Sequence, residues 1–254
     1  MLKRSFGVIV AMTIAMTACG SGGSDQPPAG SSQDAVASIT SPPAPAIEAR
    51  LIVNEKARGF AANANRGIAE TAAPLVVVAN ADTEAKPGAV ATLRDFAEER
   101  PRCGIAGPLL LNSDGTFQSS RRRFPTVSGT IVRRTPLRAL LKPQERQRGH
   151  YLLLERPVEP TQSDWMLGAF LLLRRQMLDE LGGFDEGFRL YGEDIDLCYR
   201  AGQAGWERWF VPHAGVIHAH AAVTDRRFLT RQTLWHWRSI ARFVRKHPER
   251  LRNI

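Results

Sequence analysis

Three carboxylates fall within four residues in the segment Gly192-Glu193-Asp194-Ile195-Asp196. The glycine before them and the glycine at Gly205 predict a helix that begins at these acids and ends near position 205. A helix N-terminus favours acids, while crowding raises the proton affinity of at least one of them. This combination suits a general base, so Asp194, with Glu193 beside it, is the candidate catalytic group. A solvated acidic helix cap is the alternative interpretation.

A second candidate site follows a run of valines. The segment Val76-Val77-Val78-Ala79-Asn80-Ala81-Asp82 changes abruptly from apolar to polar residues. Such a run predicts a buried parallel strand that delivers side chains to its carboxyl edge, where α/β sheets bind ligands. Asp82 is then placed to hold a divalent cation, with Asn80 as a neutral oxygen ligand or an outer-shell group. Taken alone, the segment also fits a plain strand-ending turn.

Two histidines, His218 and His220, alternate with apolar residues near the end of the chain. Period-two spacing directs both imidazoles to one side of an extended segment. Two histidines one residue apart are more often incidental than ligands, so spacing alone leaves their role open.

A hairpin and a strongly basic stretch occupy the middle of the chain. Residues 104–118 predict a strand, a tight turn at Asp114-Gly115 and a second strand. From Arg121 to His150 the chain carries eight arginines and one lysine against one glutamate. This stretch is either a solvated loop or a cationic lid over a diphosphate acceptor or an anionic membrane face.

The order and spacing of several segments resemble the family 2 glycosyltransferases, particularly the rhamnosyltransferase-like branch. The resemblance rests on Ser163-Asp164-Trp165-Met166-Leu167-Gly168-Ala169-Phe170-Leu171-Leu172-Leu173-Arg174-Arg175, on Gly182-Gly183-Phe184-Asp185-Glu186-Gly187-Phe188, and on Tyr191-Gly192-Glu193-Asp194-Ile195-Asp196-Leu197-Cys198-Tyr199-Arg200. Residues 58–68 are similar to the G-F-A-x-x-x-N-x-G helix of that family, and residues 76–83 to its strand ending in N-P-D-T. The similarity covers residues 51–254.

The resemblance implies an α/β fold of the GT-A nucleotide-diphospho-sugar transferase type, Rossmann-like, with a mostly parallel central sheet. It implies transfer of a sugar, expected to be rhamnose from deoxythymidine diphosphate-rhamnose, to a cell-envelope glycan or lipid-linked acceptor with inversion. Asp194 would be the base, tuned by Glu193. Asp82 and His218 would hold Mg²⁺ or Mn²⁺, Asn65 and Asn80 would join Asp82 in donor binding, and Trp165 with Gly168 would shape the acceptor side. His220 remains unassigned.

The first fifty residues do not fit this family. Residues 1–20 resemble a bacterial lipoprotein signal with Cys19 as the lipidated residue, and residues 21–50 resemble a disordered tether rich in Ser, Gly, Pro and Ala. The expected first strand, its helix and the second strand of the family are not recognisable, so the fold is expected to be N-terminally incomplete, with Leu51 to Val53 as a strand remnant. A mistaken start, an inactive truncated transferase and a divergent first half are the alternatives.

The remaining residues divide into a glycosyltransferase domain at 51–223 and a basic amphipathic helix at 224–254. In that helix Leu234, Trp237, Ala241 and Val244 recur at helical spacing among basic residues. The stripe either packs on the domain or rests on an anionic bilayer. We therefore expect a cytoplasmic protein peripheral to the inner membrane. A lipid-anchored, non-catalytic glycan-binding envelope protein is the alternative.

Composition and charge limit the classes of protein to which the chain can belong. The chain has 254 residues, 43% of them hydrophobic and 23% charged, which allows one sizeable globular domain with extensions. The formal charge of +9 gathers in two segments without a recognised nucleic-acid motif, so no nucleic-acid partner is expected. Three widely spaced cysteines predict no disulfide framework, and Cys198 is expected in the core. A processive synthase would need membrane-spanning helices, and no apolar run is long enough.

Overall fold

The computed structural model describes residues 7–11, 50–56, 58–124, 156–188, 191–219 and 231–249. The chain divides into two units, Met1–Thr13 with Lys56–Ile254, and Ile14–Glu55. In the second unit, the described residues 50–55 form no helix or strand, and Leu51 and Val53 are 88% and 72% exposed. The expected strand remnant at 51–53 is therefore wrong, because these side chains are not buried in a sheet. Cys19, His220 and most of the basic stretch at 121–150 lie outside the described residues.

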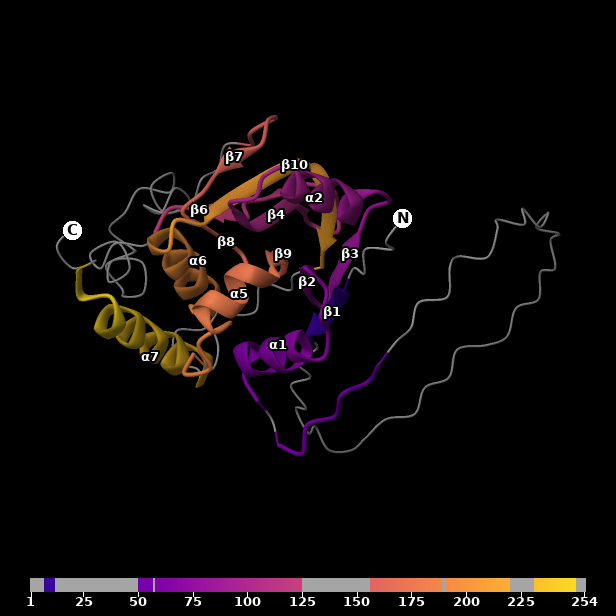
Figure 1. Cartoon of the computed structure of the whole chain (residues 1–254). Coiled ribbons are helices and arrows are strands. Elements are labelled where there is room, and N and C mark those ends of the chain that lie inside the picture. Colours follow the sequence, from indigo (N-terminus) through magenta and orange to yellow (C-terminus); the bar gives the residue numbers. More distant parts are fainter. Residues whose placement is uncertain are drawn as a thin grey trace, which may run out of the picture. The chain divides into compact units, whose positions relative to one another are not determined.

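An eight-stranded sheet forms the centre of the larger unit (Figure 1). Its main path runs in the order β1-β2-β9-β4-β10-β3, while β5 pairs with β4 and β7 with β10. Two further strands, β6 and β8, form a separate small sheet. The strands are β1 (Gly7–Ala11), β2 (Leu75–Asn80), β3 (Thr83–Ala85), β4 (Cys103–Leu111), β5 (Phe117–Gln118), β6 (Arg121–Arg122), β7 (Thr161–Gln162), β8 (Trp165–Met166), β9 (Phe170–Arg174) and β10 (Glu207–His218).

The sheet is mixed. β1 runs parallel to β2 and β10 runs parallel to β4, but β9 lies between β2 and β4 and is antiparallel to both. The predicted hairpin is confirmed, since Leu111 of β4 pairs antiparallel with Phe117 of β5. β1 comes from the signal-like segment, and its residues pair in register with β2 from Gly7 opposite Val76 to Ala11 opposite Asn80.

Helices cover both faces of the sheet. Side chains that alternate along β2 enter two separate cores: Val76 and Val78 join one cluster, and Val77 and Ala79 join the other. The first core is shared with α1 (Phe60–Ala69), α5 (Arg175–Leu181) and α6 (Glu193–Gln203), the second with α2 (Ala89–Glu98). β2 is therefore buried on both sides, as its continuous apolar run predicts.

Two arginines between β9 and α5 hold helix ends in place. The guanidinium of Arg174 donates to the carbonyls of Ala97, Arg100 and Cys103, around the end of α2. Arg175 donates to the carbonyls of Ile68 and Thr71 at the end of α1. The last carbonyls of a helix have no partner within it, and cations near them also suit the helix dipole. The Arg174-Arg175 pair thus ties both helices to the sheet.

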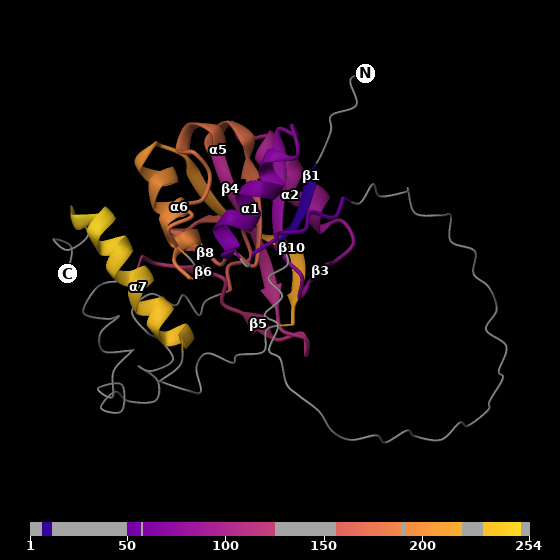
Figure 2. The ribbon, with the colours of Figure 1, turned by 90° about the horizontal axis from the view of Figure 1, so that it is seen from below.

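The C-terminal basic helix forms as α7 (Arg231–Lys246) and lies beside α6 (Figures 1 and 2). Among residues 235–246 of this helix, the buried side chains are Ser239 and Phe243, followed by His247 just beyond the helix. Ala241 is exposed, and Trp237 and Val244 are only partly buried. The side chain of Leu234, the fourth member of the predicted stripe, lies outside the described residues. For the other three, the interpretation that this stripe packs on the domain is wrong, because a different stripe makes the buried contacts. Among the described residues, no helix is long and apolar enough to cross a membrane.

Candidate active site

The two predicted metal ligands lie side by side at the end of the sheet. His218 is the last residue of β10 and pairs antiparallel with Thr83 of β3, which directly follows Asp82. The backbone amide of Ala219 donates to the carbonyl of Asp82 at 2.9 Å, which closes the strands at this edge. Nε2 of His218 lies 3.5 Å from Oδ2 of Asp82. The ladder between β3 and β10 therefore brings together two residues that are 136 positions apart in the sequence.

A third side chain orients His218. The third side chain is that of Gln118 at the end of β5, whose amide oxygen lies 2.8 Å from Nδ1 of His218. A proton on Nδ1 makes this a hydrogen bond and leaves Nε2 with a lone pair toward Asp82. Metal-binding histidines are commonly held in this way by an acceptor on the other ring nitrogen. Gln118 was read only as part of a hairpin strand from the sequence, although it lies in the segment that resembles the family.

The donor set fits a hard divalent cation. Two ligands of one Mg²⁺ at about 2.1 Å lie roughly 3 Å apart when they are adjacent in an octahedron. The separation of 3.5 Å between Asp82 and His218 is close to that value. In the described part of the chain, no three His, Cys, Asp or Glu side chains come together as a complete metal cage. The pair could therefore hold Mg²⁺ or Mn²⁺ only with further oxygens, such as those of a diphosphate.

Asp194 lies in the first turn of α6, as the sequence predicts. The chain enters this helix through Tyr191 and Gly192, both with positive φ, at 66° and 93°. Positive φ is unusual for tyrosine and indicates local strain, which is common at functional sites. The carboxylate of Asp194 accepts the backbone amides of Gly168 at 3.0 Å and Ile195 at 2.8 Å. These two bonds fix both of its oxygens.

Gly168, predicted on the acceptor side, touches the predicted base. A Cβ at this position would lie 3.4 Å from Cβ and 3.6 Å from Oδ2 of Asp194. A methyl group here would make ordinary van der Waals contact with the carboxylate that the amide of Gly168 binds. The next residue, Ala169, links Asp194 to the Asp82–His218 pair. Its carbonyl accepts a hydrogen bond from the backbone amide of Asn80 at 2.8 Å. Gly168-Ala169 thus connects Asp194 with the strand end that carries Asn80 and Asp82.

Burial and charge set the proton affinity of the acids. Burial raises the pKa of Asp194, while the amides of Gly168 and Ile195 and the Arg122 cation lower it. Glu193 is 8% exposed, and its Oε2 has no hydrogen-bond partner among the described residues. Burial, and then repulsion by Asp194, raises the pKa of Glu193 to about 8. Near neutral pH, Glu193 therefore keeps its proton and places no second negative charge beside Asp194.

Arg122 is a site residue that sequence analysis missed. It lies on β6 next to β8, and its guanidinium carbon is 5.1 Å from the ring centre of Trp165. Trp165 is 4% exposed and donates its indole N–H to the carbonyl of Arg123 at 2.8 Å. The buried indole thus supports the strand that carries Arg122, and its predicted contact with the acceptor stays a prediction. The signal was present in Arg121-Arg122-Arg123, but the whole basic stretch was interpreted as one loop or lid.

The predicted donor residue Asn65 is engaged with the backbone of the loop before α6. Its amide nitrogen donates to the carbonyl of Phe184 at 2.8 Å, and its oxygen accepts the Phe184 amide at 2.9 Å. Asn65 therefore joins α1 to the Gly183-Phe184-Asp185 loop. Its predicted role in donor binding stays a prediction, as does the role of Asn80, whose described contacts are made by its backbone.

The model of the family described as "Glycosyltransferase like family 2" matches residues 30–235, and the chain belongs to this family. Both the predicted family and the predicted α/β fold class are thereby confirmed.

Relatives indicate the branch of the family. The chain is 38% identical over 159 residues to N-acetylglucosaminyl-diphospho-decaprenol L-rhamnosyltransferase of Mycobacterium tuberculosis (strain H37Rv), covering 59% of this chain and 48% of that protein. It is 38% identical over 81 residues to rhamnosyltransferase WbbL of Escherichia coli K12, covering 32% and 30%. The match thus spans about half the length of the mycobacterial relative and less than a third of WbbL. A crystal structure of GalNAc-T7 with UDP, GalNAc and Mn²⁺ aligns with 65% of this chain and 31% of its own, at 22% identity and a TM-score of 0.47.

Proposed function

We propose that this chain is an inverting rhamnosyltransferase that uses a nucleoside-diphosphate sugar and a divalent cation. The observation that carries the proposal is the linkage of the Asp82–His218 pair, through Asn80 and Gly168-Ala169, to the carboxylate of Asp194. The similarity to rhamnosyltransferases supports rhamnose as the sugar. The printed name of the mycobacterial relative supports a lipid-linked, N-acetylglucosaminyl-diphosphate acceptor.

Asp194 is the base in this mechanism. Its ionised carboxylate takes the proton of the acceptor hydroxyl while that oxygen forms a bond to the anomeric carbon. The bond from this carbon to the diphosphate breaks on the opposite face, so the configuration inverts and the nucleoside diphosphate leaves with the electron pair. Gly168 and Ile195 hold the carboxylate in place through their amides. Glu193, protonated near neutral pH, avoids a second charge beside the base.

Asp82 and His218 would hold the cation, with Gln118 fixing the imidazole. When bound, Mg²⁺ or Mn²⁺ neutralises the charge of the departing diphosphate. Asn65 and Asn80 are proposed to line the donor side, and Trp165 with Gly168 the acceptor side.

A transfer assay tests the proposal. The full chain is incubated with deoxythymidine diphosphate-rhamnose, Mn²⁺ and an N-acetylglucosaminyl-diphospho-lipid, and the product is followed by mass spectrometry. Removing a general base lowers turnover by about a hundred- to ten-thousandfold, so Asp194→Asn should be nearly silent. The matched control is Asp179→Asn on the exposed side of α5. Transfer by Asp194→Asn at the wild-type rate would refute the assignment of the base.

We also propose that the protein works at the cytoplasmic face of the inner membrane, where nucleotide sugars and lipid-linked acceptors meet. The pairing of Gly7–Ala11 with β2 supports retention of this segment in the domain rather than its removal as a signal. The lipid-anchored alternative through Cys19 predicts cleavage before Cys19, which intact-mass measurement of the chain recovered from cells distinguishes.

A further inference from the structure

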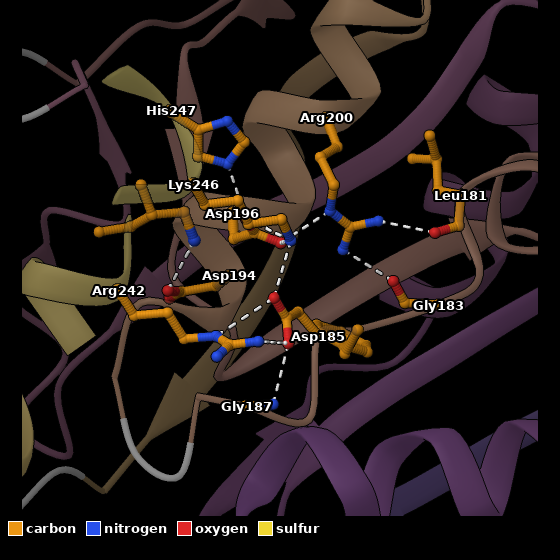
Figure 3. Close-up of polar contacts among 12 residues, drawn as sticks. Leu181, Gly183, Asp185, Gly187, Asp194, Asp196, Arg200, Arg242, Lys246 and His247 are labelled. Carbon is orange, nitrogen blue, oxygen red and sulfur yellow. Dashed lines mark hydrogen bonds and ion pairs between the residues drawn. The ribbon is translucent and has the colours of Figure 1, made fainter. Parts of the chain in front are cut away.

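A buried carboxylate decides which face of α7 meets the domain. Asp196 of α6 is fully buried and receives three basic groups: Arg200 at 2.7 Å, Lys246 at 2.9 Å and His247 at 2.8 Å (Figure 3). Two of them come from the end of α7. Removing a partner from a buried charge is strongly unfavourable, so these contacts hold α7 in one rotational setting.

A second acid strengthens the same contact. Asp185, in the loop before α6, accepts Arg242 at 2.7 Å and Lys246 at 2.8 Å (Figure 3). Although burial raises the pKa of Asp185, the hydrogen bonds from Arg242 and Lys246 hold it well below its usual value. Phe243 packs between these ion pairs against Phe188 and Tyr199. Arg242, Phe243, Lys246 and His247 therefore form the domain-facing side of α7, which we call the clasp.

Within the described part of the chain, the side of the helix opposite the clasp is not buried. Residues advance by about 100° along an α-helix, so Ala241 lies about 200° from Phe243. Trp237 lies four residues before Ala241 and Val244 three residues after it, which places all three on one stripe. Ala241 is exposed and the other two are partly exposed. Arg238 and Arg245 lie together along one edge of this stripe, are exposed, and have no acidic partner among the described residues.

An apolar stripe that contains a tryptophan and is bordered along one edge by arginines has the chemistry of a helix that lies at a lipid–water interface. We propose that the outer face of α7, formed by Trp237, Arg238, Ala241, Val244 and Arg245, binds the surface of an anionic bilayer. The opposite charge of the lipid headgroups is the reason to name a bilayer as the partner. The inference deepens the proposed function, since the clasp would fix the helix that carries Asp194 relative to a lipid-linked acceptor.

Vesicle flotation tests this surface independently of sugar transfer. The full chain with Cys19→Ser, so that acylation cannot carry the binding, is mixed with vesicles of phosphatidylcholine alone or with phosphatidylglycerol added. We expect flotation only with the anionic vesicles. Each arginine near such a surface contributes about fivefold in binding, so Arg238→Gln with Arg245→Gln should weaken it about thirtyfold. The charge-matched control is Arg94→Gln with Arg156→Gln, two exposed arginines outside α7, which should float as the parent does.

A second readout locates the tryptophan. Brominated lipids should quench the emission of the parent chain, and Trp237→Phe should remove most of this quenching. Thermal melting of each variant confirms that it is folded. Equal flotation of the Arg238/Arg245 double variant and the parent, or unchanged quenching in Trp237→Phe, would overturn the proposal. If flotation holds while the transfer assay fails, the proposed function is at fault and the lipid surface stands.

Discussion

Replacing Glu193 with glutamine should change how stability depends on pH. Glu193 is buried, and its pKa rises from 4.5 to about 8 in the folded chain. The folded state therefore binds this proton more tightly than the unfolded state. The stabilisation is fully present below pH 4.5 and is lost as pH rises toward 8. Glutamine is neutral between pH 4.5 and 8 and has nearly the same shape as glutamate. The variant should therefore not lose this stabilisation as the pH rises.

The size of the effect follows from the pKa shift. One pH unit between the two pKa values corresponds to about 1.4 kcal/mol, so two units from pH 5 to pH 7 give an upper limit of about 3 kcal/mol. Relative to wild type, Glu193→Gln should gain up to this amount in the free energy of unfolding between pH 5 and pH 7.

Urea unfolding at the two pH values measures this difference. Glu159→Gln, which removes an exposed carboxylate, is the matched control and should run parallel to wild type. Comparing slopes rather than absolute stabilities removes any constant cost of the glutamine amide. A Glu193→Gln curve parallel to wild type between pH 5 and pH 7, within about 0.5 kcal/mol, would refute the interpretation of Glu193 as a buried, protonated acid.

Three other substitutions test neighbouring parts of the argument. Arg122→Gln should move the acidic limb of kcat/KM to higher pH, because this cation lowers the pKa of Asp194; an unmoved limb would show that the cation does not act on the base. Asp82→Ala should abolish Mn²⁺-dependent binding of deoxythymidine diphosphate in calorimetry, whereas retained binding would exclude Asp82 as a ligand. Asp196→Asn should lower the free energy of unfolding by about 3 kcal/mol, against less than about 1 kcal/mol for Asp95→Asn in an exposed ion pair, as urea melts would show.

Local pattern was sufficient for the elements that carry the candidate site. The valine run predicted a strand that ends at Asn80, and β2 ends there. The glycines around the acidic segment predicted a helix from Glu193, and α6 begins at that residue and ends at Gln203, two residues before Gly205. Both predictions rest on signals within a few residues, namely burial on two faces and the special backbone angles that glycine adopts.

Pairings across the sheet could not be predicted in the same way. Gln118 orients His218 across a hundred residues, and it does so because β5 and β10 both lie beside β4. Nothing in the local pattern around Gln118 indicates its neighbours in the sheet. The same holds for Arg122, whose position near Asp194 depends on the pairing of β6 with β8.

The face of α7 shows a different limit. Its sequence contains two stripes at helical spacing, and the more apolar one was the natural choice for packing. The structure buries the other stripe, because Asp185 and Asp196 accept Arg242 and Lys246 and thereby orient the helix. Sequence periodicity shows how apolar each face of a helix is. In α7 the basic partners of the acids Asp185 and Asp196 determine which face turns toward the domain.

Helix geometry points the carboxylates of the acidic segment toward different partners. Its three carboxylates look like one crowded cluster in the sequence, yet Asp194 and Asp196 lie about 200° apart around α6. Asp194 turns to the amide of Gly168 and shares its electrostatic environment with Glu193, whereas Asp196 turns to α7. Within the segment, repulsion by Asp194 adds to burial in raising the pKa of Glu193. Asp196 keeps α7 attached to α6, whose first turn also carries Asp194. The same turn of α6 therefore holds both the proposed base and the contact to the helix whose outer face we assign to the membrane.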